Sequence, residues 1–219
     1  MYLENINGPS DIQKLNLDEL RILADETRDA LIHKISLAGG HNGPNLGMVE
    51  VTTALHYVFH SPIDKFVFDV SHQSYPHKIL TGRKQAFLDE EHFHDVTGYT
   101  NPEESEHDFF TIGHTSTSIS LALGLAKGRD LNHGKENIIA IIGDGSLSGG
   151  EALEALDYAG EYRNNLIIIV NDNDQSIAEN HGGLYKNLKE LRESNGNCTN
   201  NIFESFGLEY HYLEDGHDL

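Results

Sequence analysis

The chain has 219 residues, of which 38% are hydrophobic and 23% are charged, as in a globular protein rather than a disordered one. Its formal net charge of -20 and its scattered basic residues argue against nucleic acid or an anionic membrane as a partner. The single cysteine, Cys198, excludes an internal disulfide framework and fits a reducing compartment. The N-terminus has no signal-peptide pattern, and no apolar run approaches the roughly 20 residues of a membrane span. We therefore expect a cytoplasmic protein.

The N-terminal part of the chain predicts two helices separated by a glycine-rich break. Asn16, followed by Glu19 three residues later, precedes an apolar pattern of helical period. This is typical of a capped amphipathic helix, which we expect to end near Ser36. A glycine-rich segment follows over residues 38–47, and residues 48–59 predict a second helix.

The next part of the chain predicts one strand and one helix. Residues 65–70 are rich in β-forming side chains, and a polar loop with His72 and His77 follows them. Residues 83–108 are charged and irregular and give no clear prediction. Residues 115–129 predict a helix of small residues, which can pack closely against a sheet.

A strand–turn–helix–strand unit is the clearest pattern in the sequence. Residues 137–142 form a continuous apolar run, which predicts a strand buried on both faces. A Gly-Asp-Gly turn follows, then a predicted helix over residues 151–162 and a second buried strand over residues 166–170. Such a unit joins parallel strands, so we expect an α/β fold with a parallel sheet flanked by helices. Further along, we expect a helix over residues 184–192 and a weaker strand over residues 208–212.

Polar side chains follow both apolar strands directly. Asp144 comes after the first strand, and Asn171-Asp-Asn173 comes after the second. The carboxyl ends of parallel strands meet at one edge, where a carboxylate and an amide oxygen suit Mg²⁺. Gly143 and Gly145 would let the backbone approach an anion, and the next helix N-terminus offers free N–H groups. A protein this acidic needs a metal to hold a diphosphate, because a helix end supplies only about half a unit charge.

Each of these two motifs also has a simpler interpretation. Gly-Asp-Gly is typical of an ordinary turn, and Asn-Asp-Asn after a strand is typical of a loop or a helix cap. The residues alone leave both interpretations open.

Longer stretches resemble a known enzyme family. The segments GDGSLSGGEALEAL and NLIIIVNDNDQSIAEN resemble the thiamine diphosphate motif of transketolase-like enzymes. The segments LAGGHNGPNLGMVEVTTALHYVF, FDVSHQSYPHKILTGR and IGHTSTSISLALGLA are similar to successive signatures of the 1-deoxy-D-xylulose-5-phosphate synthase family, in the same order. The resemblance covers residues 6–219. It implies the fold of the diphosphate-binding domain of transketolase, with thiamine diphosphate and Mg²⁺ as cofactors.

The resemblance also implies roles for individual residues. Asp144, Asn173 and the backbone carbonyl of Gln175 would bind Mg²⁺, and Gly145 and Ser146 would touch the diphosphate. The residues expected to line the cofactor are His72, Gly113, His114, Thr115 and Asn173. His41 would face the substrate end of the cofactor and help proton transfer.

Other residues have no such role in this interpretation. His77 lies in a family motif without an assigned function. The remaining histidines that we interpret as structural or solvated are His33, His56, His60, His92, His94, His133 and His211. We interpret the acidic run 103–106 as a solvated loop, and Cys198 has no base beside it that would make it a nucleophile.

The resemblance further implies that residues 1–219 form a truncated cofactor-binding domain. The pyrimidine-binding and C-terminal domains would be absent, and with them the glutamate that protonates the aminopyrimidine and the arginines that hold the acceptor phosphate. We therefore expect the chain alone to be inactive, and to form a homodimer or to associate with the missing domain. The segment between Asn180 and Phe203 is shorter than in typical synthases, and Asn42 to Asn45 replace small and apolar residues.

The implied reaction joins pyruvate to glyceraldehyde 3-phosphate with loss of CO2 and gives 1-deoxy-D-xylulose 5-phosphate. Two alternatives stay open at this point. One is ketol transfer between sugar phosphates, as in transketolase. The other is a cofactor-binding module or split subunit that performs no turnover.

Overall fold

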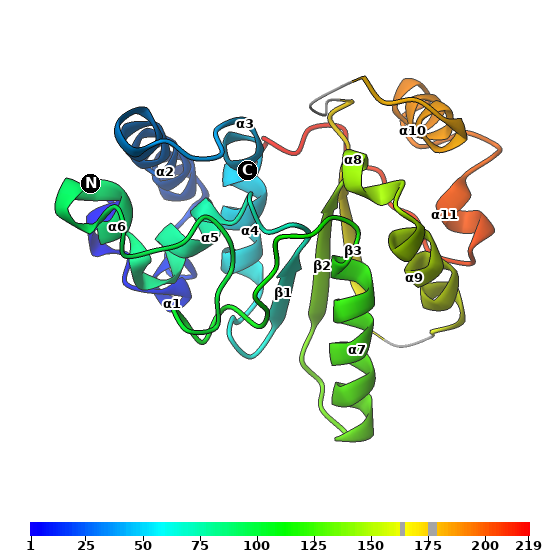
Figure 1. Cartoon of the computed structure of the whole chain (residues 1–219), viewed down its shortest axis with the longest axis horizontal. Helices are drawn as coiled ribbons and strands as arrows, with labels where there is room; N and C mark the ends of the chain where they lie inside the picture. Colours follow the sequence, from blue (N-terminus) through cyan, green and yellow to red (C-terminus); the bar gives the residue numbers. More distant parts are fainter. Residues whose placement is uncertain (163–164, 175–178) are drawn as a thin grey trace.

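A three-stranded parallel sheet forms the centre of the computed structural model, which describes residues 1–162, 165–174 and 179–219. The strands β1 (Lys65–Phe68), β2 (Ile138–Gly143) and β3 (Ile167–Asn171) lie in the order β1-β2-β3. In the register of β2 and β3, Gly143 lies opposite Asn171. Figure 1 shows helices on both sides of this sheet. The predicted α/β fold with parallel neighbouring strands is confirmed.

β2 is buried on both faces, as its continuous apolar run predicts. One face packs against α7 (Ser118–Leu131) and α9 (Gly150–Glu161), and the opposite face packs against α4 (Val49–Val58) (Figure 1). These three helices confirm the predictions for residues 115–129, 151–162 and 48–59. The residues of β2 with no exposed surface are Ile138, Ile139, Ala140, Ile141 and Ile142.

β3 differs from the prediction of a second fully buried strand. All of its residues, Ile167 to Asn171, are only partly buried. Among the described residues β3 pairs with β2 alone, so it forms an edge of the sheet. The apolar run therefore identified the strand correctly but not its degree of burial, because the residues of an edge strand can be just as apolar as those of a central strand.

The N-terminal helices form a second core beside the sheet. α2 (Leu17–Ala38) packs against α4 and α6 (Gln85–Leu88), with Leu23 and Phe87 fully buried between them. The predicted cap is present: the backbone N–H of Glu19 donates to Asn16 Oδ1 at 3.1 Å, and that of Asn16 donates to Glu19 Oε2 at 2.8 Å. The short elements are the 3₁₀ turns Leu3–Asn5 and Glu90–His92, the π-type turn Ile79–Arg83, and the helices α1 (Pro9–Ile12), α3 (Gly43–Leu46), α5 (Tyr75–Lys78), α8 (Asp144–Leu147) and α11 (Ile202–Ser205).

The C-terminal part confirms one prediction and overturns another. The helix expected over residues 184–192 is present as α10 (Gly183–Glu193). Residues 208–212 are coil, so the weak strand predicted there is wrong. Instead of pairing with a strand, this segment packs through its side chains, and the ring of Tyr210 stacks on Phe203 at 5.5 Å. In the part of the chain that the structure describes, no helix is both long and apolar enough to cross a membrane.

Candidate cofactor site at the carboxyl edge of the sheet

The two predicted metal ligands lie beyond neighbouring strand ends. Asp144 follows Gly143 at the end of β2, and Asn173 lies two residues beyond Asn171 at the end of β3. Because Gly143 and Asn171 are register partners, Asp144 and Asn173 both lie beyond the carboxyl ends of their strands, at the same end of the sheet. Gln175, expected to contribute its carbonyl, lies outside the described residues.

The Asp144 carboxylate is buried in surroundings that favour a cation. Its side chain accepts a hydrogen bond from Asn180 Nδ2 at 3.0 Å, and the residue is 3% exposed. Burial, and after it the neighbouring Asp172 carboxylate, raise the pKa of Asp144 above its usual value. A divalent ion would offset both effects. The described residues contain no group of three or more His, Cys, Asp or Glu side chains that could hold a metal, so an ion here would need amide, carbonyl or phosphate oxygens as further ligands.

An arginine restrains the loop that carries Asn173. Arg192 Nη1 donates to both carboxylate oxygens of Asp172 at 2.6 Å, and Arg192 Nη2 lies 2.9 Å from Asp174 Oδ1. The two partners are the residues on either side of Asn173. Sequence reasoning missed Arg192 because it lies 20 residues beyond Asp172, on a different element.

The Gly-Asp-Gly-Ser turn is held against the loop that contains Gly113, His114 and Thr115. Ser116 Oγ donates to the carbonyl of Ser146 at 2.7 Å. The backbone N–H of Ser116 donates to Asp69 Oδ1 at 2.8 Å, and Ser118 N–H donates to Asp69 Oδ2 at 2.9 Å. Asp69 therefore joins the end of β1 to the start of α7. Asp69 directly follows the observed strand β1, whereas the strand expected from the sequence over residues 65–70 would have included it.

The residues expected to line the cofactor are accessible on these loops. Gly113, His114, Thr115 and Gly145 are exposed, and Ser146 is partly buried. A side-chain Cβ at Gly113 would meet no atom within 4 Å, so the backbone there is open to an approaching ligand. The structure thus brings the loop of Gly113 to Thr115 close to Gly145 and Ser146, at the strand ends that precede Asp144 and Asn173.

The two candidate histidines, His41 and His72, lie side by side. Their ring centroids lie 5.4 Å apart, and the ring of Tyr99 lies 5.5 Å from that of His41. Burial, followed by the nearby His41, lowers the pKa of His72. His72 Nδ1 is shielded from solvent and has no hydrogen-bond partner among the described residues. An orphaned polar atom at this place is consistent with a site that a ligand completes.

His77 is a structural residue in a buried polar network. His77 Nε2 lies 3.1 Å from Asp108 Oδ1, and Arg83 donates to both oxygens of Asp108 at 2.7 and 3.0 Å. An ionised carboxylate only accepts, so His77 carries its proton on Nε2 and its Nδ1 accepts from His56 Nε2 at 3.0 Å. Burial alone would raise the pKa of Asp108, but hydrogen bonds from His77 and Arg83 hold it well below its usual range.

The same network corrects the interpretation of the acidic run 103–106. Glu104 has a side chain only 10% exposed and pairs with Lys78 and Arg83. Only Glu103 and Glu106 are exposed. Charge runs are usually solvated, but here the shielded cations Lys78 and Arg83 require an anionic partner.

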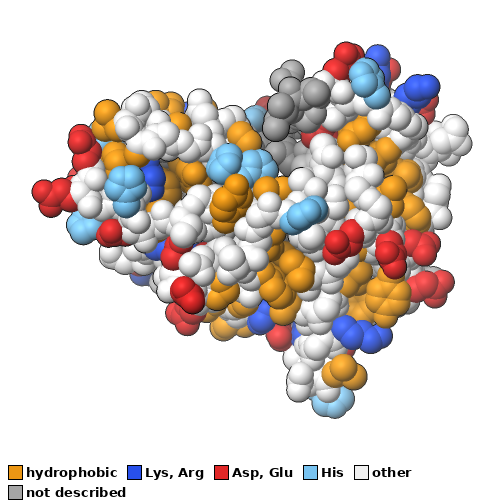
Figure 2. Space-filling model, viewed as in Figure 1, with side chains coloured by type: hydrophobic (Ala, Val, Ile, Leu, Met, Phe, Trp, Pro, Cys, Tyr) orange, Lys and Arg blue, Asp and Glu red, His pale blue; other side chains and the backbone are white. Residues whose placement is uncertain are grey.

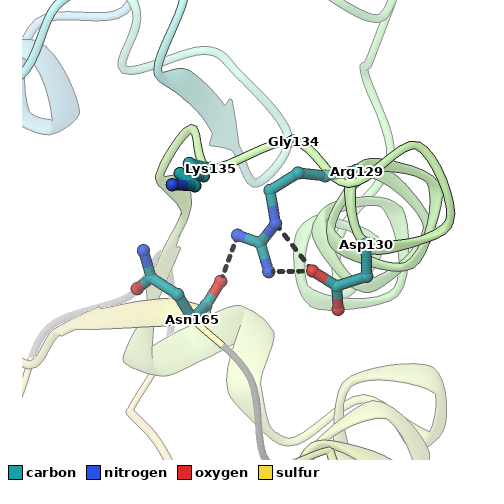
Figure 3. Close-up of a pocket in the computed structure, with 5 residues that line it drawn as sticks. All are labelled: Arg129, Asp130, Gly134, Lys135 and Asn165. Carbon is teal, nitrogen blue, oxygen red and sulfur yellow. Dashed lines mark hydrogen bonds and ion pairs between the residues drawn. The ribbon is translucent and has the colours of Figure 1, made fainter.

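A cavity of about 430 Å³ opens at the other end of the sheet and does not belong to this site. In Figure 3 the guanidinium of Arg129 lies between the side chain of Asp130 and the carbonyl of Asn165. Arg129 also donates to the carbonyl of Glu136 and to the Tyr162 hydroxyl. Its five N–H donors are all used within the protein, so Arg129 ties α7 to the turns at the base of the sheet.

Figure 2 shows histidine side chains near the centre of one face, where the N-terminal helices meet the sheet, and acidic side chains spread around the periphery. The acidic surface agrees with the net charge of -20. A phosphorylated ligand would therefore approach through a repulsive field and would have to be neutralised locally.

The fold and the polar strand edge define a transketolase-like α/β domain. Two solved transketolases, one a mutant from Pichia stipitis and one from Campylobacter jejuni, superpose with a TM-score of 0.67 each. They are 18% and 20% identical to the chain, cover 90% and 88% of it, and are themselves covered to 32% and 33%.

The sequence comparisons identify the family within this class. The family model described as 1-deoxy-D-xylulose-5-phosphate synthase matches residues 3–199, so the chain belongs to that family. The synthase of Caldanaerobacter subterraneus is 50% identical over 190 residues, and that of Halalkalibacterium halodurans is 51% identical over 192 residues. These matches cover 87% and 88% of the chain but only 30% of either relative. The chain thus spans about a third of the length of these relatives.

Proposed function

We propose that this chain binds Mg²⁺ and thiamine diphosphate and supplies the diphosphate half of a 1-deoxy-D-xylulose-5-phosphate synthase site. The observation that carries the proposal is the register pairing of Gly143 with Asn171, which places Asp144 and Asn173 at one edge of the sheet. Family membership and the oxygen donors at this edge both support it.

The roles proposed for individual residues are those that the family resemblance implies. Asp144, Asn173 and the carbonyl of Gln175 would hold the ion, and Gly145 and Ser146 would contact the diphosphate. His72 and the residues Gly113 to Thr115 would line the cofactor. When bound, thiamine diphosphate supplies the carbanion chemistry, while the protein binds and orients it.

His41 is the residue of this chain that we expect to move a proton at the substrate. It is partly buried, and its Nδ1 lies 3.5 Å from the Tyr75 hydroxyl, which helps to set the ring's orientation. An imidazole can give or take a proton near neutral pH, which suits the joining of pyruvate to glyceraldehyde 3-phosphate with loss of CO2. This reaction forms 1-deoxy-D-xylulose 5-phosphate.

We further propose that turnover requires a pyrimidine-binding domain, in a homodimer or in association with another polypeptide. The chain spans only about 30% of the relatives' length, and the relatives carry the synthase name as whole proteins. Residues 1–219 would then form the cofactor-binding domain of a larger assembly, in which two domains complete the active site.

Titration calorimetry with thiamine diphosphate at saturating Mg²⁺ tests the binding proposal. Asp144→Asn keeps the side-chain shape and removes its charge, so affinity should fall by about 10- to 100-fold. Asp157→Asn removes a charge from an exposed position on α9 and should change little. Equal affinities for wild type and Asp144→Asn would refute the site.

A reconstitution experiment tests the reaction. The chain is mixed with the remaining part of a full-length relative, and CO2 release is measured with pyruvate and glyceraldehyde 3-phosphate. Turnover with a ketose phosphate donor instead would indicate transketolase chemistry. Cofactor binding without turnover of either donor would indicate a binding module.

A further inference from the structure

The loop after β3 is held by a single guanidinium group. Arg192 on α10 contacts both oxygens of Asp172 through Nη1 and one oxygen of Asp174 through Nη2. The planar fork of arginine can bridge two carboxylates in a fixed geometry, which a lysine ammonium cannot do. One side chain therefore fixes both residues that flank Asn173.

The backbone of this loop needs such a restraint. Asp174 has a φ of 56°, in the left-handed region that non-glycine residues adopt at an energetic cost. Arg192 and Asp172 are partly buried, with side chains 25% and 16% exposed, so their ion pair is shielded from water more than a surface pair. These contacts restrain the backbone on both sides of Asn173, and of the two carboxylates Asp172 is the better shielded.

Arg192 has two opposed effects on a cation bound at this edge. Its positive charge repels the cation, and at about 4 Å such a repulsion is substantial even at an intermediate dielectric. Its hydrogen bonds order the loop and so reduce the entropy lost when Asn173 binds a ligand. The net effect on affinity depends on which of the two is larger.

We propose that Arg192 is a positioning residue for Asn173. The ordering effect of Arg192 on the loop then outweighs the electrostatic repulsion between Arg192 and the metal. The inference rests on the proposed function of Asn173 as a ligand of the Mg²⁺–diphosphate group. α10 lies in the short segment between Asn180 and Phe203, so this segment takes part in shaping the cofactor site.

Three variants separate geometry from charge. Arg192→Lys keeps the charge and loses the fork, and Arg192→Gln loses both. Lys189→Gln is the matched control, because Lys189 lies one turn earlier on α10, has a side chain 64% exposed and pairs with Glu193. Calorimetry with thiamine diphosphate at saturating Mg²⁺ should show about tenfold weaker binding for both Arg192 variants, which is a typical effect of residues that orient metal ligands. The control should bind almost as tightly as wild type. Unchanged or tighter binding for either Arg192 variant would overturn the proposal.

A second measurement needs no cofactor. The NMR order parameter of the Asn173 backbone amide should be near the rigid value of about 0.85 in wild type and should fall below about 0.6 in Arg192→Gln. Lys189→Gln should keep the rigid value. If the order parameter does not change, Arg192 does not position the loop, even where cofactor binding itself has been demonstrated. Absence of Mg²⁺-dependent binding in wild type would instead refute the proposed function and leave the loop measurement to decide the role of Arg192 in ordering it.

Discussion

The side-chain amide of Asn45 donates from Nδ2 to the backbone carbonyl of His72 at 2.7 Å. The same nitrogen donates to the carbonyl of His41 at 2.6 Å, and Oδ1 accepts from the backbone N–H of Tyr75 at 2.8 Å. Asn45 has no exposed surface. One buried amide thus joins its own loop, which carries His41, to the carbonyl of His72, 27 residues further along the chain.

The first prediction concerns these two donated bonds. Asn45→Asp keeps the acceptor for Tyr75 but replaces both donors with a carboxylate that faces two carbonyl oxygens. We expect a loss of about 1 to 3 kcal/mol in the free energy of unfolding, because buried carbonyls lose their partners. We also expect the pKa of His72 to rise toward its ordinary value as the loop loosens and the ring gains solvent. Urea unfolding and NMR titration of the imidazole measure the two effects.

The control for this experiment is Asn42→Asp, which adds the same charge at an exposed position of the same loop. It should leave stability nearly unchanged. If both variants shift the pKa of His72 equally, the added charge is the cause and Asn45 does not fix the histidine loop.

The second prediction concerns Asp108. Asp108→Asn removes the charge that balances Arg83 and replaces one of two oxygens that accept from His77 and Arg83 with an NH2 group, which can only donate. Breaking a buried pair by removing one partner costs about 3 to 5 kcal/mol, so the variant should lose that much stability at pH 7.5 in urea. Asp95→Asn breaks the exposed pair with His92 and should cost less than about 1 kcal/mol. A loss for Asp108→Asn no larger than that of the control would contradict a structural role for this network.

The third prediction is a loss of stability on mild acidification. Burial lowers the pKa of His56 well below its ordinary value, lowers that of His77, and lowers that of His107 to about 4. A histidine with a lowered pKa in the folded state contributes stability that is complete above about pH 6.5 and is lost as pH falls from there toward the folded pKa. Each such histidine steepens the slope by up to about 1.4 kcal/mol per pH unit. Asp108, with its lowered pKa, adds a second loss only below about pH 4.

Urea unfolding between pH 7.5 and 4.5 measures this slope. His107→Gln should reduce it, because His107 faces His77 and Arg83 and shares their network. His92→Gln should not reduce it, because His92 is exposed and its hydrogen bond to Asp95 raises its pKa rather than lowering it. A slope unchanged by His107→Gln would show that His107 is not a source of the acid sensitivity.

The sequence predicted those features of the fold and site that depend on local pattern. The apolar run of β2 and the position of Asp144 directly after it identified both the strand and its polar end. The burial of β3 could not be predicted in the same way, because it depends on which strands are neighbours. The same limit applies to Asn45 and Arg192, whose partners lie 27 and 20 residues away. A polar side chain carries no local signal of a distant partner, so His77 and Glu104 also received their roles only from the folded structure.

The fourth prediction tests how closely the Gly-Asp-Gly-Ser turn packs on the loop before α7. A Cβ built at Gly149 would lie 1.9 Å from Ser116 Oγ and 2.5 Å from Ser116 Cβ, so Gly149→Ala forces the two loops apart. Ser116 has a φ of 72°, which glycine adopts without strain, so Ser116→Gly removes the clash and suits the backbone, at the cost of the hydrogen bond to Ser146. We expect Gly149→Ala alone to destabilise the protein and the double variant to recover part of the loss, with a coupling of about 1 to 3 kcal/mol in a double-mutant cycle of urea unfolding.

Gly150→Ala is the matched control, because a Cβ at Gly150 meets no atom within 4 Å and the position is the first residue of α9. If the losses of Gly149→Ala and Ser116→Gly simply add, the two loops do not touch at this point, and Ser146 is not held where a diphosphate would need it.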